Sequence, residues 1–182
     1  LVRINMAHLL TTCRLVLALP VAIGLARPMF LSPVTLSVLL GLAVTTDYLD
    51  GRVARATATA SANGQLFDHA TDCIFVTTGL AGAAAAGLVT PILPVCVALA
   101  FSQYVFDSYV LHHRKQLRMT PIGRWNGIFY FSPLFMISAS RLMVFERSAT
   151  FLIETASNAA YILIITTAVS VVDRAAAPGT PS

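Results

Sequence analysis

The chain has 182 residues, of which 57% are hydrophobic and only 11% are charged. This composition excludes an ordinary soluble domain, in which charged residues make up about a quarter of the chain. The net charge of +4 comes without a basic stretch interleaved with aromatic residues, so it argues against nucleic acid and favours membrane lipids and phosphorylated substrates. The length suits one domain over residues 1–182, with a flexible tail over about 175–182.

Apolar runs of about 20 residues predict an all-α integral membrane protein, a bundle of six transmembrane helices. In chain order, the predicted spans cover residues 8–26, 34–55, 64–88, 91–112, 124–146 and 150–172. The second and third spans are polar in the halves that the chain joins, which is typical of helices that line a polar cavity inside a membrane. Arg14 interrupts the first run and no small-residue cleavage site follows it, so this run is not predicted to be a signal peptide.

The distribution of basic residues predicts the orientation of the bundle. With the N-terminus inside, the cytoplasmic segments hold Arg3, Arg52, Arg55, Arg114, Lys115, Arg118, Arg124 and Arg174. The opposite side holds only Arg27 and Arg147. Because cytoplasmic segments of membrane proteins are enriched in Lys and Arg, we expect both termini and the polar cavity at the cytoplasmic face of a bacterial inner membrane.

Half of the eight acidic residues lie between residues 47 and 72. They form two pairs, Asp47 with Asp50 and Asp68 with Asp72, and separations of three and four residues place each pair on one face of a helix. Carboxylates clustered in an apolar context repel one another unless a cation compensates them. Mg²⁺ and Mn²⁺ prefer oxygen ligands of this kind, and the number of carboxylates suits two ions. This stretch therefore predicts a metal site.

The order of residues in this stretch is more specific than its charge. It runs Asp, two residues, Asp-Gly, two residues, Ala-Arg, eight residues, Gly, three residues, Asp, three residues, Asp. This order closely resembles the signature of the CDP-alcohol phosphatidyltransferases. The resemblance implies an enzyme that moves a phosphatidyl or similar substituted phosphoryl group from a CDP-linked donor, expected to be CDP-diacylglycerol, to a hydroxyl acceptor and releases CMP. It also implies that Asp47, Asp50, Asp68 and Asp72 share the metal ions and that Asp72 is the general base.

Small residues between the aspartates are expected to contact the nucleotide. Gly51 and Gly64 would let it approach the backbone closely. Ala54 shares a helix face with Asp47, where a larger side chain would fill the pocket. Arg55 suits a phosphate oxygen or an aspartate.

The first predicted span begins with a weaker likeness to the same family. Residues 7–14 read AHLLTTCR and resemble the family's usual N-terminal segment at Thr11 and Arg14. Ala7 and His8 stand where that segment has Pro and Asn. The resemblance adds Thr11 to the expected nucleotide contacts.

The sequence leaves the acceptor open between two classes. A polyol phosphate such as glycerol 3-phosphate would be bound by Arg118, Arg124 and Arg141, with His69 as a substrate contact or a hydrogen-bond partner. An amino-alcohol substrate would instead need an acidic residue and aromatic rings around its cation, for which the candidates are Asp107, Glu154, Tyr104, Trp125 and Tyr130. The second class corresponds to a phosphotransferase that uses CDP-choline or CDP-ethanolamine and a lipid hydroxyl acceptor.

A divalent-cation transporter or sensor is the alternative from another functional class. It accounts for the aspartates but not for the glycine, alanine and arginine positions between them. The glycine- and alanine-rich stretch 79–87 suits close helix packing or a homodimer interface. Cys13, Cys73 and Cys96 each lie in a predicted span and are expected to pack as small apolar residues, not to form a disulfide or zinc site.

Overall fold

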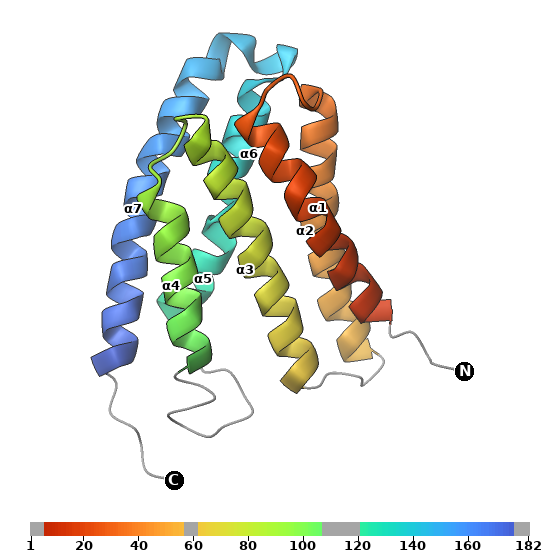
Figure 1. Ribbon diagram of the computed structural model, residues 1–182, viewed down its shortest axis with the longest axis vertical. Helices are drawn as coiled ribbons and strands as arrows, with labels where there is room; N and C mark the ends of the chain where they lie inside the picture. Colours follow the sequence, from red (N-terminus) through yellow and green to blue (C-terminus); the bar gives the residue numbers. More distant parts are fainter. Residues whose placement is uncertain (1–5, 57–61, 107–120, 177–182) are drawn as a thin grey trace.

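The computed structural model describes residues 6–56, 62–106 and 121–176, and side chains over 11–49, 64, 66–106 and 121–175. Every regular element in these ranges is a helix, which confirms the all-α class for the part described. The α-helices are α1 (Met6–Ala26), α2 (Pro33–Ala56), α3 (Ala62–Ala85), α4 (Ile92–Phe106), α5 (Pro121–Phe129), α6 (Phe131–Ser140) and α7 (Ala149–Ala176), with a 3₁₀ helix, η2 (Met143–Ser148), before α7 (Figure 1).

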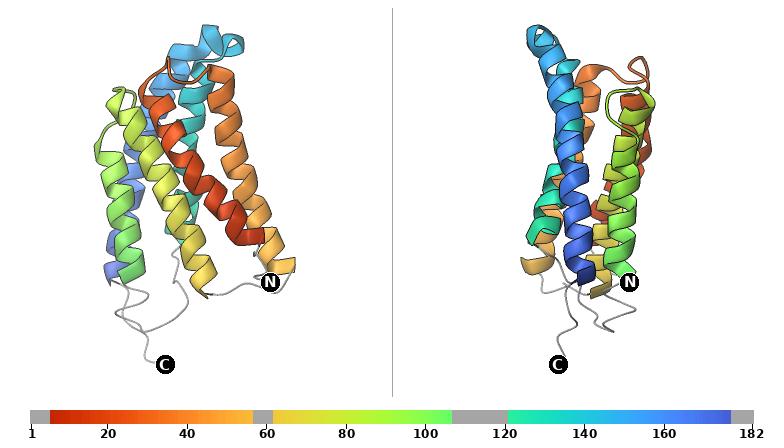
Figure 2. Two further views of the ribbon diagram at one scale, coloured as in Figure 1. Left: turned by 45° about the vertical axis from the view of Figure 1, so that its right-hand side comes forward. Right: turned by 90° about the vertical axis from the view of Figure 1, so that its left-hand side faces the viewer.

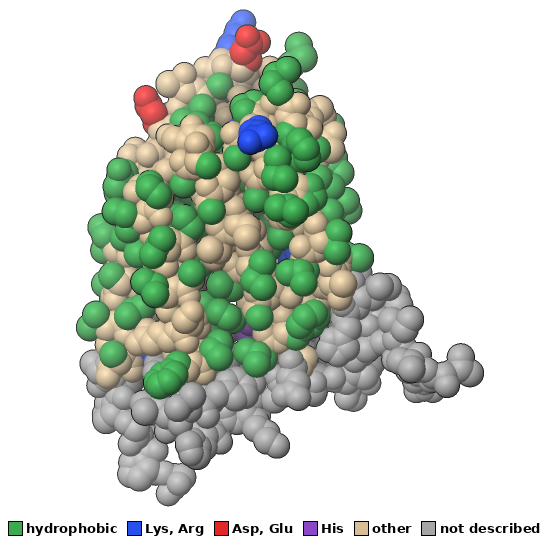
Figure 3. Space-filling model, in the orientation of Figure 1, with side chains coloured by type: hydrophobic (Ala, Val, Ile, Leu, Met, Phe, Trp, Pro, Cys, Tyr) green, Lys and Arg blue, Asp and Glu red, His purple; other side chains and the backbone are tan. Residues whose placement is uncertain are grey.

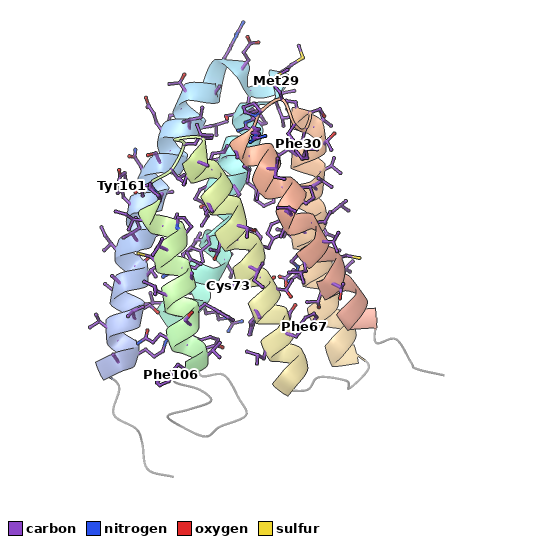
Figure 4. All side chains as sticks on the ribbon, in the orientation of Figure 1. Met29, Phe30, Phe67, Cys73, Phe106 and Tyr161 are labelled. Atoms are coloured by element: carbon purple, nitrogen blue, oxygen red, sulfur yellow. The ribbon has the colours of Figure 1, made fainter. Side chains whose placement is uncertain are left out.

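The helices pack side by side in two layers. Helix α1 packs between α2 and α3, while α7 packs on α4, α5 and α6. Seen along the layers, α1, α3 and α4 lie on one side, and α2, α6 and α7 lie on the other (Figure 2). The start of α1, the end of α2, the start of α3 and the end of α7 lie at one end of the bundle, which we call the aspartate end (Figure 1). The opposite end, which holds Met29, Phe30 and η2, is called the turn end (Figure 4).

The interface between α1 and α3 depends on a missing side chain. A Cβ atom added at Gly82 would lie 2.2 Å from the backbone carbonyl oxygen of Ala22, so only glycine permits this approach. Around it, the core is made of fully buried apolar residues from several helices: Val21, Leu25, Leu36, Leu40, Phe75, Leu80, Leu93, Leu134 and Ile137. The prediction that the stretch 79–87 serves close helix packing is thus met at Gly82.

The predicted span 124–146 is interrupted in the structure, where α5 ends at Phe129 and α6 begins at Phe131. Pro133 explains the break, because it has no N–H group for the Phe129 carbonyl and its ring crowds that carbonyl. The hydroxyl of Ser132 donates a hydrogen bond to the same carbonyl oxygen over 2.8 Å. A second interruption follows, since α6 ends at Ser140 and η2 begins at Met143. Prediction from apolar runs missed both, because a window of about 20 residues passes over the single proline at Pro133 and the charged residue Arg141.

The outside of the bundle is largely apolar between its ends. Exposed apolar side chains include Val16, Leu19, Val38, Leu99, Phe151 and Ile165. On the face in Figure 3, apolar side chains spread over the side of the bundle, and charged side chains gather at the turn end. Among the described residues, one helical segment, Met143–Ala175, is long and apolar enough to cross a membrane by length and composition. The shorter segments Thr11–Ala26, Pro33–Leu49 and Ile92–Phe106 are also apolar.

Candidate active site

A buried arginine and three carboxylates from three helices meet near the aspartate end. Arg14 comes from α1, Asp47 from α2, and Asp68 and Asp72 from α3. The Arg14 Nη1 atom lies 3.2 Å from Asp47 Oδ1 and 3.4 Å from Asp68 Oδ1, and it also contacts Asp72 Oδ1 directly. The Arg14 side chain is 0% exposed, whereas the Asp47 side chain is 41% exposed and those of Asp68 and Asp72 are each 27% exposed. The arginine thus forms the floor of the group, and the carboxylates lie between it and the surface.

Helix geometry explains why these side chains converge. Asp68 and Asp72 are four residues apart, so they project from one face of α3 in successive turns. Phe67 and Cys73, which flank them in the chain, lie in the half of α3 nearer the aspartate end (Figure 4). Helix α1 packs against both α2 and α3, so a long side chain on α1 reaches carboxylates on both. The position of Arg14 therefore follows from the packing of α1 between its two neighbours.

His69 adjoins the carboxylates on α3. One potential ligand atom from each of Asp68, His69 and Asp72 lies within 4.8 Å of the others. Carboxylate oxygens suit Mg²⁺ and Mn²⁺, and an added imidazole nitrogen is also compatible with Mn²⁺. The donor set therefore fits a hard divalent cation, as the clustered aspartates predict, with His69 added as a possible ligand.

The other residues predicted to bind the nucleotide or metal differ in how much of them the structure describes. Asp50, Gly51, Ala54 and Arg55 lie in the last two turns of α2, but their side chains are outside the described part. Gly64 lies in the first turn of α3. All belong to helix ends that meet at the aspartate end (Figure 1). Thr11, predicted to contact the nucleotide, is 2% exposed and lies one turn before Arg14 on α1.

The two predicted acceptor arginines that the structure describes, Arg124 and Arg141, lie apart in the bundle. Arg118 lies outside the described residues. Arg124 is exposed on α5. Arg141 lies at the turn end, where its Nη1 and Nη2 atoms donate hydrogen bonds to the backbone carbonyls of Gly24 over 2.6 Å and Leu25 over 2.7 Å. The expectation that Arg141 serves the acceptor site is therefore not supported by its position, because its guanidinium binds the C-terminal end of α1 instead.

A second polar group, which we call the Tyr104 cluster, joins His69 on α3 to side chains of α4 and α7. It consists of His69, Gln103, Tyr104 and Arg174. The His69 and Tyr104 rings meet edge to face with centroids 6.5 Å apart, and the Arg174 guanidinium carbon lies 5.1 Å from the Tyr104 ring centroid. Gln103 Nε2 donates to the Val171 carbonyl over 3.2 Å, which ties α4 to α7. His69 Nε2 and Gln103 Oε1 are buried and have no hydrogen-bond partner among the described residues.

Sequence reasoning gave too small a role to two of these arginines. The sequence resemblance includes Arg14 only as a match to a family segment, yet a lone charge inside an apolar run is itself a signal of a buried partner. For Arg174 the sequence predicts only a place on the cytoplasmic side. Its partner Tyr104 lies 70 residues earlier in the chain, and no local pattern links the two. The three cysteines are free; Cys73 and Cys96 are partly buried, as packing residues would be, whereas Cys13 is exposed.

Comparison with known proteins identifies the chain at the level of its family. The description of the matching family model is CDP-alcohol phosphatidyltransferase, and the match covers residues 4–172. We found no match among curated proteins and none among solved structures. The family match extends far beyond the acidic stretch and includes α1 with Arg14 as well as nearly all of α7. The chain therefore belongs to the CDP-alcohol phosphatidyltransferase family, whose members are membrane-embedded phosphotransferases of phospholipid synthesis.

Proposed function

We propose that the protein moves a phosphatidyl group from CDP-diacylglycerol to a hydroxyl group of a polyol phosphate, such as glycerol 3-phosphate, and releases CMP. The observation that carries this proposal is the meeting of Asp47 with Asp68 and Asp72 around Arg14, in a chain of this family. Asp50, one turn after Asp47 on α2, completes the proposed metal ligands. Two Mg²⁺ or Mn²⁺ ions held there would supply positive charge beside the pyrophosphate of the donor.

Asp72 is our candidate for the general base. Its carboxylate would accept the proton of the acceptor hydroxyl while that oxygen forms a bond to the lipid-side phosphorus. The bond from this phosphorus to the CMP oxygen would break, and its electron pair would leave with CMP. Asp72 lies one turn farther along α3 than Asp68, and its side chain is partly exposed, which supports a role next to the metal ligands where a substrate can reach it.

The nucleotide would be held where α1, α2 and α3 meet. Our proposed contacts are Thr11 on α1, Gly51, Ala54 and Arg55 on α2, and Gly64 on α3. All three helix ends lie at the aspartate end, which supports the assignment (Figure 1). A shallow apolar hollow of about 460 Å³ between α3 and α4 begins at Thr77, five residues after Asp72, and is lined mostly by alanine and proline.

The Tyr104 cluster supports a phosphorylated acceptor over an amino alcohol. Arg174 brings a permanent positive charge to the Tyr104 ring, and the other ring neighbour of Tyr104 is His69, which is adjacent to the carboxylates. The same guanidinium covers one face of the buried Tyr104 ring, so that face is not free for a choline-type cation. Glu154, an acidic candidate for binding an amino alcohol, is exposed near the start of α7, close to the turn end. We therefore add Arg174 to Arg118, Arg124 and His69 as proposed acceptor contacts.

We further propose that six membrane crossings place the aspartate end in the cytoplasm of a bacterial cell. The positions of the described basic residues support this orientation. Arg124 and Arg174 lie in helices near the aspartate end, whereas Arg27 and Arg147 lie in the connections at the turn end. Counting α5 and α6 as one interrupted crossing gives an even number of passes, which agrees with the start of α1 and the end of α7 at the same end (Figure 1).

The test is CMP release by the purified protein in detergent with CDP-diacylglycerol and Mg²⁺ or Mn²⁺. Glycerol 3-phosphate, inositol phosphate, inositol, serine and choline would be compared as acceptors, and Asp72→Asn would serve as the inactive control. We expect CMP only with a phosphorylated acceptor. CMP release with serine or choline instead would overturn the acceptor class and keep the family activity.

Two alternatives are separated by the donor. Activity with CDP-choline or CDP-ethanolamine and diacylglycerol, without activity on CDP-diacylglycerol, would replace our proposal with the amino-alcohol phosphotransferase. A cation transporter or sensor would be indifferent to CDP and CMP. Binding of CMP to the wild-type protein but not to an Ala54→Leu variant would therefore argue against transport.

A further inference from the structure

The Arg14 guanidinium occupies the point on which three carboxylates converge. Its Nη1 atom alone contacts oxygens of Asp47, Asp68 and Asp72, and these come from two helices other than its own. Arginine usually binds one carboxylate through two parallel N–H groups. One nitrogen surrounded by three carboxylate oxygens is instead the arrangement expected around a small cation. One guanidinium nitrogen of Arg14 thus takes the position among the carboxylate oxygens that a metal ion would take.

Burial makes this charge necessary. Three carboxylates side by side in a largely apolar bundle would repel one another and oppose the packing of α2 against α1 and α3. The fully buried Arg14 supplies one positive charge. The group as a whole still carries more negative than positive charge, so it attracts a further cation. A charge attached to α1 is always present, whereas a dissolved cation is present only when it binds.

The same geometry makes Arg14 and a metal ion competitors. Mg²⁺ binds oxygen at about 2.0–2.1 Å, so an ion that takes the same oxygens needs the space between them. That space holds Nη1. The positive charges of Arg14 and of a metal ion bound to the same oxygens would also repel each other strongly, because water screens charges poorly inside the bundle.

We propose that Arg14 is a tethered counter-ion that holds the carboxylates together in the metal-free protein and competes with divalent cations for them. This inference rests on the metal ligands of the proposed function. Its consequence is that the metal-free protein stays folded while its metal affinity is held down. Removal of Arg14 would therefore have opposite effects on two properties, lowering the stability of the metal-free protein and raising its affinity for metal.

The test compares wild type with Arg14→Met, both purified in detergent with Mn²⁺. Free Mn²⁺ is measured by electron paramagnetic resonance during titration, and the midpoint of thermal unfolding is measured with Mn²⁺ and with EDTA. We expect Arg14→Met to bind Mn²⁺ at least about tenfold more tightly because a repelling charge is gone. We also expect its unfolding midpoint in EDTA to fall by about 10 °C, with most of this loss recovered by Mn²⁺.

Arg141→Met is the matched control, because Arg141 is another arginine that binds groups inside the bundle, yet it contacts carbonyls at the turn end. It should lower the unfolding midpoint equally in Mn²⁺ and EDTA and leave Mn²⁺ affinity unchanged. Unchanged or weaker Mn²⁺ binding in Arg14→Met would overturn the competition. Absence of Mn²⁺ binding by the wild type would instead overturn the metal ligands themselves.

A second pair of variants covers the case in which Arg14→Met does not fold. Asp47→Asn and the double variant Arg14→Met with Asp47→Asn differ only by the arginine, and the double variant loses one charge of each sign. Tighter Mn²⁺ binding by the double variant than by Asp47→Asn would support the proposal. Equal or weaker binding would overturn it.

Discussion

Helix α1 is involved in two arginine contacts, and the two arginines meet different chemical groups. About two turns into the helix, Arg14 contacts carboxylates of Asp47, Asp68 and Asp72. At the end of the helix, Arg141 of the α6–η2 connection donates to the carbonyls of Gly24 and Leu25. Arg14 contacts full negative charges, and a metal ion would bind the same carboxylates. Arg141 contacts backbone carbonyl dipoles.

The comparison shows that burial of a charge does not reveal its role. The last carbonyls of a helix lack partners within the helix and carry its negative dipole end, so a guanidinium there completes the structure of α1. Carboxylates held together by an arginine have no such structural need, since apolar side chains would pack there more cheaply. The aspartate end therefore holds a group whose arrangement favours function over stability, and the turn end holds the bundle together.

The largest expected effect is the loss of activity in Asp72→Asn, a change at the aspartate end that should leave stability nearly unchanged. Loss of the proposed base should lower the rate of CMP release by about 10²–10⁴-fold. The unfolding midpoint should change little, because the substitution keeps the shape of the side chain and removes one of several repelling charges. Glu146→Gln, an exposed acidic residue of η2, is the matched control and should leave both properties unchanged. Activity of Asp72→Asn near the wild-type level would remove Asp72 from catalysis.

At the turn end, the largest loss of stability is expected from Gly82→Ala. The added Cβ would overlap the Ala22 carbonyl oxygen, and two helix backbones cannot separate without loss of packing. We expect a loss of about 3 kcal/mol in the free energy of unfolding. Gly41→Ala on α2 is the matched control, because nothing lies within 4 Å of its added Cβ, and it should gain about 0.5–1 kcal/mol. Chemical denaturation in detergent measures both, and equal effects of the two would contradict the close α1–α3 contact.

The sequence predicted the aspartate end better than the turn end, for physical reasons. Asp68 and Asp72 are close in the chain, and helix periodicity alone brings them together. Arg14 lies 54 and 58 residues before them, so its contacts depend on how α1 packs. The bond from Arg141 to Gly24 spans 117 residues and reaches a backbone atom, which no side-chain pattern encodes. Apolar runs gave the helix order but not the break at Pro133, because an apolar count does not include the missing N–H group.

Arg141→Met is expected to have an intermediate effect on stability. It leaves the Gly24 and Leu25 carbonyls without their charged donor. The loss should be about 2 kcal/mol, which for a chain of this length corresponds to roughly 4–8 °C in the unfolding midpoint. Because the change lies at the turn end, the affinity for CMP should stay the same. A loss of CMP affinity with unchanged stability would contradict the division between the two ends and return Arg141 to the list of substrate contacts.

The smallest effect is expected from Ser138→Ala, which tests how much of the turn end depends on Arg141. Ser138 and Ser37 share a hydrogen bond of 2.8 Å between α6 and α2, and the Ser37 hydroxyl also donates to the Pro33 carbonyl over 2.9 Å. Ser37 therefore keeps a partner in the variant, and the loss should stay near about 0.5–1 kcal/mol. Ser140→Ala should lose less, because the Ser140 hydroxyl donates within its own helix to the Ile137 carbonyl. If Ser138→Ala cost as much as Arg141→Met, the contact between α2 and α6 would hold the turn end as strongly as the arginine does, and the role given to Arg141 would be too large.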